Sequence, residues 1–330
     1  MSITIGDMVF DAPVFLAPMS GVTDLPFRRL ARRLGAGLET SEMIACREAI
    51  QRSTASRKKA ARATHNAAMA VQLAGHDPDI MAEAAKICAG EGADIIDLNF
   101  GCPAKKVVGK QSGSALMRDE RHAARILQAV VSAVDVPVTL KMRTGWDDAN
   151  RNAPALARIA QECGIRLVTV HGRTRAQRYR GQADWLFIRR VKQAVHIPVV
   201  ANGDIVCLED VRRCLEQSGA DGVMIGRGAC GRPWFIRQAI RFVATGVAEP
   251  APSLAEQRNI VLGHFDAMLE HHGTYLGVRN FRKHISWYSN GLNNSARFRS
   301  HVYALDRADR VRAAIRDFYA AAMDGVADAA

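Results

Sequence analysis

Residues 95–106 read IIDLNFGCPAKK, an aliphatic run that ends abruptly in a Gly-Cys-Pro turn followed by two lysines. The run Ile95–Phe100 has the length and composition of a buried β-strand, and the turn after it cannot extend that strand. Asp97 and Asn99 are two positions apart, so their side chains project from the same face of the strand. The segment therefore predicts a strand that brings polar side chains, and then the thiol of Cys102, to its carboxyl end.

Aliphatic runs of this kind recur along the first 230 residues, and most segments between them, such as 78–90 and 120–134, have the pattern of helices. The eight runs span residues 14–18, 37–43, 68–75, 94–100, 136–143, 166–172, 197–203 and 221–226. Eight βα units in series predict a (β/α)8 TIM barrel, and their number argues against a doubly wound sheet.

The last part of the chain has a different pattern. A helical stretch follows Trp234, a connector broken by prolines spans residues 248–253, and from Leu254 onward the pattern is helical without any Pro. We therefore expect a barrel domain over residues 1–247 and a small all-helical domain over residues 253–330. One barrel of about 250 residues plus a small appendage suits a chain of 330 residues.

The composition restricts the class of protein. Lys and Arg number 45 against 33 Asp and Glu, and a net charge of +12 favours a polyanionic partner such as nucleic acid. Seven cysteines without a C-x-x-C pair predict neither a disulfide framework nor a metal site, and they suit a reducing compartment. The start lacks a basic leader, and no run reaches the ~18 apolar residues of a membrane span. We expect a cytoplasmic protein, by default a monomer, without a membrane segment.

Side-chain parity places polar residues inside the mouth of the barrel. Residues alternate along each strand between the barrel interior and the helix layer. The polar residues on the interior side are Gln72, Asp97, Asn99, Thr139, Lys141, Arg143, Thr169 and His171. Because the carboxyl ends of barrel strands hold the active site, we expect these side chains to converge there. Two of them have an alternative: Lys141 could form an ion pair with Asp97, and His171 could be a satisfied core histidine.

The last two strands predict a phosphate site. Asn202, Gly203 and Asp204 follow the seventh strand, and Gly226 and Arg227 follow the eighth, which is where barrels commonly bind phosphate. Residues 226–231 also match G-x-G-x-x-G. A dinucleotide fold is nevertheless excluded, because seven βα units precede the match and the nearest suitably spaced acid lies in the proline connector.

Several segments together resemble the tRNA-dihydrouridine synthases, most closely their bacterial B-type branch. They are APMSGVTD at 17–24, DLNFGCPAKK at 97–106, LKMRTGW at 140–146, VHGRTR at 170–175, ANGDI at 201–205, IGRG at 225–228 and RKHISWY at 282–288. The resemblance covers nearly the whole chain. It implies an FMN enzyme that reduces the C5–C6 double bond of a uridine in tRNA, with NADPH reducing the flavin.

The resemblance also assigns roles. Reduced flavin would give a hydride to C6 of the uracil, and Cys102 would give a proton to C5, since a cysteine thiol with an ordinary pKa of about 8.5 is mostly protonated at neutral pH. Lys141 would stabilise the anion formed when the flavin is reduced. The residues assigned to the flavin are Pro18, Met19, Ser20, Gln72, Lys141, His171, Asn202, Gly203, Asp204, Gly226 and Arg227.

Basic residues near the same face are expected to hold the tRNA. Residues 105–114 are expected to form a mobile loop, a second basic cluster follows the sixth strand, and the stretch from Arg279 to His301 contains no acidic residue. In that stretch Trp287 is expected to pack rather than bind. The expected substrate contacts are Asn99, Lys105, Lys106, Arg143, Arg173, Arg175, Arg282 and Lys283.

Two other functions compete with this one. A flavin reductase for a small pyrimidine, of the dihydroorotate type, would share the barrel, a lysine and a catalytic acid, but it has no use for the basic tail. A noncatalytic RNA-binding regulator would not need Cys102 or Lys141. The uridine position and the choice between NADPH and NADH stay open.

Overall fold

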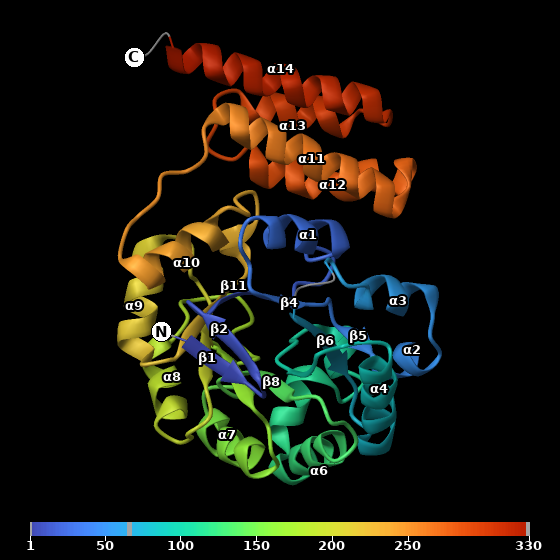
Figure 1. Ribbon diagram of the computed structural model, residues 1–330, viewed down its shortest axis with the longest axis vertical. Coiled ribbons are helices and arrows are strands. Elements are labelled where there is room, and N and C mark those ends of the chain that lie inside the picture. The colour runs from blue at the N-terminus through green and yellow to red at the C-terminus, as the bar shows by residue number, and fades with distance from the viewer. Residues whose placement is uncertain (1, 65–67, 328–330) are drawn as a thin grey trace.

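The computed structural model describes residues 2–64 and 68–327, and these contain eight parallel strands that curl into a barrel (Figure 1). The strands are β3 (Val14–Leu16), β4 (Leu38–Thr40), β6 (Ala68–Ala74), β7 (Ile95–Phe100), β8 (Val138–Arg143), β9 (Leu167–His171), β10 (Val199–Asn202) and β11 (Gly222–Ile225). The order of hydrogen-bonded neighbours runs from β3 through β11 and β10 back to β4, and β3 also contacts β4. The predicted (β/α)8 barrel is therefore confirmed.

Strand register confirms the predicted parity. Asp97 lies opposite Thr139, and Asn99 lies opposite Lys141 on β8. Leu140 and Met142, the alternate residues of β8, are fully buried in the core between the sheet and the helices. Polar side chains on the other face are thus brought to the carboxyl ends of neighbouring strands.

The helices of the barrel alternate with its strands. They are α1 (Leu25–Arg33), α2 (Cys46–Ile50), α3 (Thr54–Ala60), α4 (Pro78–Gly90), α5 (Lys105–Val108), α6 (Glu120–Val131), α7 (Ala153–Glu162), α8 (Trp185–Lys192), α9 (Leu208–Ser218) and α10 (Phe235–Thr245). Two short 3-10 helices, η1 (Gly113–Arg118) and η2 (Arg227–Ala229), follow β7 and β11. The predicted helix over 120–134 ends earlier, at Val131, because the chain must turn before Pro137 at the opening of β8.

The predicted strand over 37–43 is divided in the structure. β4 ends at Thr40, and a short β5 (Ile44–Ala45) then pairs with the same neighbour, β6. The cause is Ser41, whose Oγ accepts a hydrogen bond of 3.0 Å from the backbone N–H of Gln72 and so replaces a ladder bond.

An antiparallel hairpin closes the amino end of the barrel (Figure 1). Its strands are β1 (Ser2–Ile5) and β2 (Met8–Asp11), and the eight predicted strands do not include them. Ile3, Ile5 and Phe10 pack against the apolar residues that fill the barrel interior. The hairpin therefore seals one end, so the barrel opens only at the carboxyl ends of the described strands.

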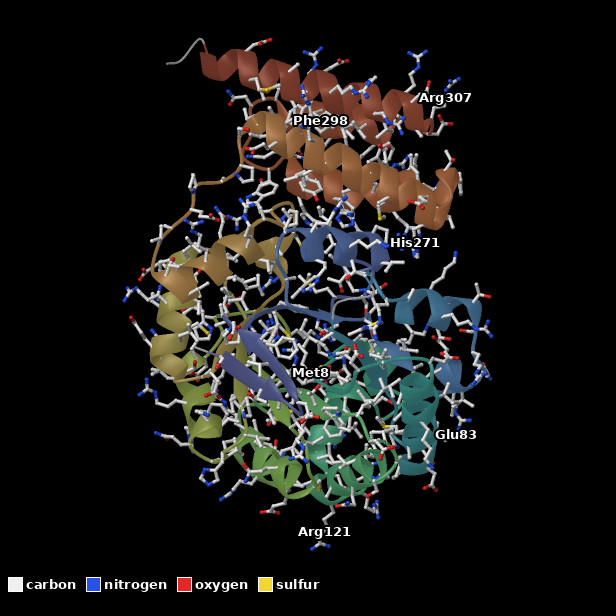
Figure 2. The ribbon with its side chains drawn as sticks, in the orientation of Figure 1. Met8, Glu83, Arg121, His271, Phe298 and Arg307 are labelled. Atoms are coloured by element: carbon white, nitrogen blue, oxygen red, sulfur yellow. The ribbon has the colours of Figure 1, made fainter. Side chains whose placement is uncertain are left out.

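Four helices follow the barrel and form a core of their own. They are α11 (Leu254–His272), α12 (Thr274–Tyr288), α13 (Ser295–Tyr303) and α14 (Ala308–Ala327). Ser253 starts α11 with a capping box, in which its Oγ and the Glu256 carboxylate each accept a backbone N–H of the other residue. Phe298, labelled in Figure 2, stacks on Phe318 inside this core with ring centroids 4.0 Å apart.

The helical region rests on the barrel through α11 and α12, with α14 on the far side (Figure 1). Phe27 of α1 packs against the rings of His264 and His284. Nε2 of His272 lies 2.8 Å from an Asp24 oxygen at the start of α1, beside the His271 labelled in Figure 2. None of the helices in the described ranges is long and apolar enough to cross a lipid bilayer.

Candidate active site

A cavity of about 760 Å³ opens at the carboxyl ends of the barrel strands. It brings together most of the predicted site residues, which come from every part of the barrel sequence. They are Pro18, Met19, Ser20, Gln72, Asn99, Cys102, Lys105, Lys106, Lys141, Arg143, His171, Asn202, Gly203, Asp204, Gly226 and Arg227.

A buried hydrogen-bond network supports the floor of this cavity. Asp97 accepts from Nε2 of Gln72 at 2.6 Å and from Oγ1 of Thr139 at 2.7 Å. Oε1 of Gln72 in turn accepts from Nδ2 of Asn99 at 2.8 Å. Burial raises the pKa of Asp97, while the hydrogen bonds from Thr139 and Gln72 oppose that rise. The network fixes which way the Gln72 amide points.

Lys141 presents a cation to the cavity. Its Nζ donates to Oδ1 of Asn202 at 3.1 Å, and Nδ2 of Asn202 donates to the Met224 carbonyl at 2.7 Å. The alternative ion pair with Asp97 does not form among the described residues; Nζ donates to Asn202 instead, while Asp97 accepts from Gln72 and Thr139. Burial, helped by the neighbouring charge of Arg143, lowers the pKa of Lys141 to about 8.

Cys102 sits on a turn that Asn99 shapes. Oδ1 of Asn99 accepts from the backbone N–H of Gly101 at 3.1 Å and from that of Cys102 at 2.9 Å. Oγ of Ser114 donates to the Cys102 carbonyl at 2.9 Å, so the segment after the turn is tied back to it. The thiol is half-buried and lines the cavity. A positioned thiol at the edge of a polar cavity can transfer a proton to a bound ligand.

The predicted mobile loop after Cys102 is helical in the structure. Residues 105–108 form α5 and residues 113–118 form η1. Gly113, the first residue of η1, has φ +63°, and a Cβ there would lie 2.8 Å from the Cys102 carbonyl oxygen. The close approach of this glycine to the turn lets the segment fold compactly, with Lys105 and Lys106 at the cavity wall.

Arg143 is a buried cation that holds loops in place. Its Nε donates to the Gly101 carbonyl at 2.8 Å, and its Nη1 donates to the carbonyls of Thr174 and Arg178. Burial lowers its pKa to about 10, and it is only 2% exposed. This arginine therefore links the Cys102 turn to the loop that follows β9.

Tyr179 is a cavity residue that the sequence did not predict. It is 57% exposed, and its ring centroid lies 5.6 Å from the Arg143 guanidinium carbon and 5.1 Å from that of Arg227. The ring of His171 lies 6.2 Å away. The sequence pattern that could have indicated this residue is an aromatic side chain between two arginines, Arg178 and Arg180, because such a pattern suits nucleotide binding.

Asp204 joins the loops after β9, β10 and β11. It accepts from Arg173 Nη1 at 2.9 Å and Nη2 at 2.5 Å, from Arg227 Nη2 at 3.1 Å and from the backbone N–H of Ala183 at 2.8 Å. Burial would raise the pKa of Asp204, but the hydrogen bonds from Arg173 and Ala183 outweigh it, so the pKa is lowered. Arg173 itself is 2% exposed and also donates to the carbonyls of Arg180 and Gly181.

His171 and Gly203 meet below these loops. Burial, together with the charges of Arg143 and Lys141, holds the pKa of His171 well below its ordinary value, so the imidazole is neutral at pH 7. Gly203 has φ +119°, and a Cβ there would lie 2.9 Å from Cδ2 of His171. Only glycine fits this position without displacing the ring.

Besides Arg173, three predicted cations lie away from the cavity lining. Arg175 places its guanidinium 4.3 Å from the ring centroid of Trp146. Arg282 donates from Nη2 to the Leu305 carbonyl at 3.2 Å, inside the helical region. Lys283 reaches the rim, where a Cβ on Gly21 would lie 4.0 Å from its Nζ.

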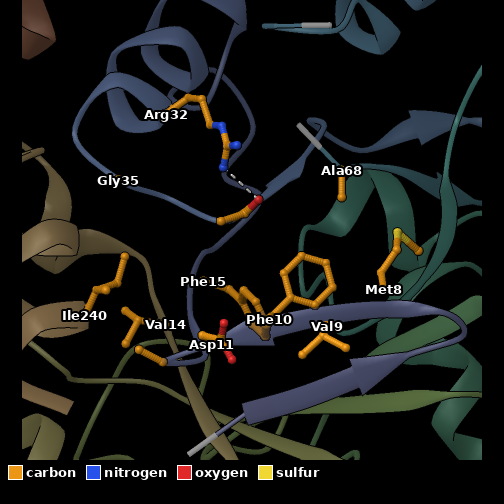
Figure 3. A pocket seen from close by; sticks show the side chains of 12 residues that line it. Met8, Val9, Phe10, Asp11, Val14, Phe15, Arg32, Gly35, Ala68 and Ile240 are labelled. Carbon is orange, nitrogen blue, oxygen red and sulfur yellow. Dashed lines mark hydrogen bonds between the residues drawn. The ribbon is translucent and has the colours of Figure 1, made fainter. Parts of the chain in front are cut away.

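A second cavity, of about 380 Å³, lies at the amino end of the barrel between β2, α1 and α10 (Figure 3). Its lining is mostly apolar, and Arg32 there donates to the Gly37 carbonyl at 3.0 Å. None of the predicted site residues lines it. Within the described ranges, no cluster of three or more His, Cys, Asp or Glu side chains could hold a metal ion.

An open cavity at the carboxyl ends of a (β/α)8 barrel, lined by a thiol and several cations, defines the active site of a barrel enzyme. The family model described as dihydrouridine synthase matches residues 15–323. The chain therefore belongs to the dihydrouridine synthase family, and the resemblance predicted from the sequence is confirmed.

Named relatives are similar over their whole length. A probable tRNA-dihydrouridine synthase of Rickettsia conorii is 54% identical, with 98% of each chain covered. The tRNA-dihydrouridine synthase B of Xanthomonas axonopodis pv. citri is 49% identical over 98% of this chain and 97% of its own. The protein of the same name from Pseudomonas aeruginosa is 47% identical over 96% of each chain.

Proposed function

We propose that this chain is a tRNA-dihydrouridine synthase, which reduces the C5–C6 double bond of a uridine in tRNA. The observation that carries the proposal is the meeting of Cys102, Lys141 and His171 on one cavity at the mouth of the barrel. Membership of the family and the names of the similar proteins support it.

The cavity fits FMN in size and in chemistry. Its volume of about 760 Å³ is within the roughly 300–1,000 Å³ usual for cofactor pockets. Pro18, Met19 and Ser20 would lie along the ring, and Gln72, Lys141 and His171 would contact its polar edge. Asn202, Gly203, Gly226 and Arg227 would hold the phosphate. Arg227 is 58% exposed, and only its Nη2 donates to Asp204, so its other N–H groups could meet an anion. When bound and reduced by NADPH, the flavin would supply the hydride that adds to C6 of the uracil.

Cys102 supplies the proton that completes the reduction. The S–H bond breaks, the proton adds to C5 of the uracil, and the thiolate left behind takes a proton from water. The Asn99 amide keeps the turn in place while this happens, since its Oδ1 holds two backbone N–H groups of the turn. Lys141 would compensate the negative charge on a reduced flavin, and a cation with little solvent around it does so more strongly than an exposed cation.

We assign chemistry to residues 1–247 and tRNA binding to residues 253–330, of which 328–330 lie outside the described part of the chain. Lys105, Lys106 and Lys283 lie at the cavity or its rim, where tRNA phosphates would pass. Arg143 and Asp204 at the cavity wall, and Arg173 behind it, act by holding loops. A monomeric, cytoplasmic enzyme that meets tRNA in solution completes the proposal.

Anaerobic flavin absorbance tests the proposal directly. The purified protein is reduced with NADPH, mixed with unmodified tRNA, and followed at the visible flavin band. Fast reoxidation by tRNA, but not by free uridine or orotate, is the expected result. Reduced flavin that reacts with the small pyrimidines and ignores tRNA would replace the proposal by a small-molecule reductase. Protein purified without flavin, and unable to bind added FMN, would refute the redox assignment.

A further inference from the structure

One face of α12 carries an aromatic residue and two cations at a helical spacing. Tyr275, Arg279 and Lys283 are four residues apart, so their side chains lie in line along the helix. Tyr275 is 66% exposed, and α12 contains no Asp or Glu. The guanidinium of Arg279 lies 5.4 Å from the Tyr275 ring centroid, and its Nη1 donates to the Tyr275 hydroxyl at 3.1 Å.

This line of side chains begins at the rim of the active-site cavity. Lys283 lies beside Gly21, whose neighbour Ser20 lines the cavity. The carboxyl half of α12 also meets the loop after β11, where a Cβ on Gly231 would touch the Trp287 backbone. Arg279 and Tyr275 follow Lys283 at about 6 Å and about 12 Å along the helix axis, leading away from the rim.

The neighbouring arginine faces elsewhere. Arg282 donates to the Leu305 carbonyl within the helical region, and its Nε is buried. It is therefore part of the packing between α12 and the turn before α14. The structure thus separates two adjacent cations, Arg282 and Lys283, that the sequence alone treats alike.

We infer that Tyr275, Arg279 and Lys283, here called the α12 stripe, form the surface on which an RNA strand lies as its target base enters the cavity. The two cations contact phosphates, and the exposed face of the Tyr275 ring stacks on a base outside the cavity. RNA is the fitting partner because a line of one aromatic residue and two cations without acids matches a polyanion that carries stackable bases. This inference rests on the proposed function and names the part of the helical region that grips the substrate.

Binding of tRNA to the holoenzyme across a series of KCl concentrations tests the stripe. Tyr275→Ala should raise Kd about 5-fold or more at every salt concentration, whereas Tyr275→Phe should retain most of the affinity because the ring remains. Arg279→Ala and Lys283→Ala should each reduce the slope of log K against log salt by about one. Flavin content and the rate of flavin reduction by NADPH should match the wild type in all four variants.

A control variant separates the stripe from general charge. Arg316→Ala removes an exposed arginine from α14, on the side of the helical region away from the barrel (Figure 1), and should leave Kd and slope unchanged. Stripe variants that bind like Arg316→Ala, while tRNA still reoxidises the wild-type flavin, would overturn the stripe alone. Wild-type flavin that tRNA cannot reoxidise would overturn the proposed function even if the stripe binds RNA as expected.

Discussion

Replacing Asp204 by asparagine should destabilise the fold strongly, although Asp204 lines the active-site cavity. Its carboxylate is the shared acceptor for Arg173, Arg227 and the Ala183 N–H. Arg173 is 2% exposed, so without the carboxylate a positive charge would stay buried with only neutral partners. Breaking a buried ion pair by removing one partner costs about 3–5 kcal/mol.

The lower end of that range applies here, about 3 kcal/mol. Asp204 is 28% exposed, and Arg173 keeps its hydrogen bonds to the Arg180 and Gly181 carbonyls. The loop that these bonds hold also carries Tyr179, so its loosening should weaken flavin binding as well. The destabilisation should shrink below about pH 4. The pKa of Asp204 is lower in the folded protein than its value of about 3.9 in the unfolded chain. The stabilisation that its carboxylate provides is therefore present above about pH 3.9 and is lost as the pH falls through the folded-state pKa.

Urea unfolding of wild type and Asp204→Asn at pH 7 and at about pH 3 measures the loss of stability and its decrease at low pH. Asp309→Asn is the matched control, because Asp309 pairs with Arg307 on the surface, where the two side chains are 57% and 71% exposed. This substitution should change the free energy of unfolding by less than about 0.5 kcal/mol. An Asp204→Asn protein as stable as this control would refute the reasoning. So would a loss of flavin affinity without any loss of stability, because Asp204 would then act on the cofactor rather than on the loops.

Three further predictions concern residues of the same cavity. Cys102→Ala should slow flavin reoxidation by tRNA about 10²- to 10⁴-fold with an unchanged melting curve, and a smaller effect in stopped-flow absorbance would remove Cys102 as the acid. Lys141→Met should stabilise the flavin-free protein at pH 7 by up to about 3 kcal/mol. The pKa of Lys141 is about 8 in the folded protein, below its ordinary value of 10.5, so the stability of the wild type rises as pH increases between these two values. In urea titrations, the difference in stability between wild type and Lys141→Met should therefore vanish near pH 10.5. Gly203→Ala should lose FMN affinity in fluorescence titrations because a Cβ there meets His171 at 2.9 Å, whereas Gly90→Ala at the end of α4, where a Cβ has no atom within 4 Å, should keep it. Equal affinities would refute the role of Gly203 in shaping the cavity.

The fold of the barrel was predictable because its signal is local. Each strand is a short aliphatic run, and parity along Val138–Arg143 sorts the core side chains from the cavity side chains. The hairpin β1–β2 was missed although Gly6 and Asp7 form a turn of the expected kind between alternating residues. Its partners lie at the amino ends of strands far along the chain, and a single sequence does not reveal that long-range packing.

The roles of the arginines were harder to predict, because a charge count does not distinguish a buried cation from an exposed one. Arg173 and Arg175 are two residues apart, yet the first is buried against Asp204, which lies 31 residues away, and the second stacks on Trp146. The role of each arginine depends on the side chain that it contacts, and that side chain lies at the end of another strand. The same holds for Arg282 and Lys283, which differ in role because only Lys283 reaches the barrel rim.

Asn99 shows how the two halves of the proposed chemistry depend on one side chain. Its Nδ2 donates to Gln72, which helps set the amide that would meet the flavin, and its Oδ1 accepts from the Cys102 N–H, which sets the proton donor. An aspartate could accept from the turn but could not donate to the Gln72 carbonyl oxygen, and a leucine could do neither. In the proposed enzyme the amide of Asn99 would therefore couple the position of the thiol to that of the cofactor, so that a hydride and a proton would reach adjacent carbons of one bound uracil.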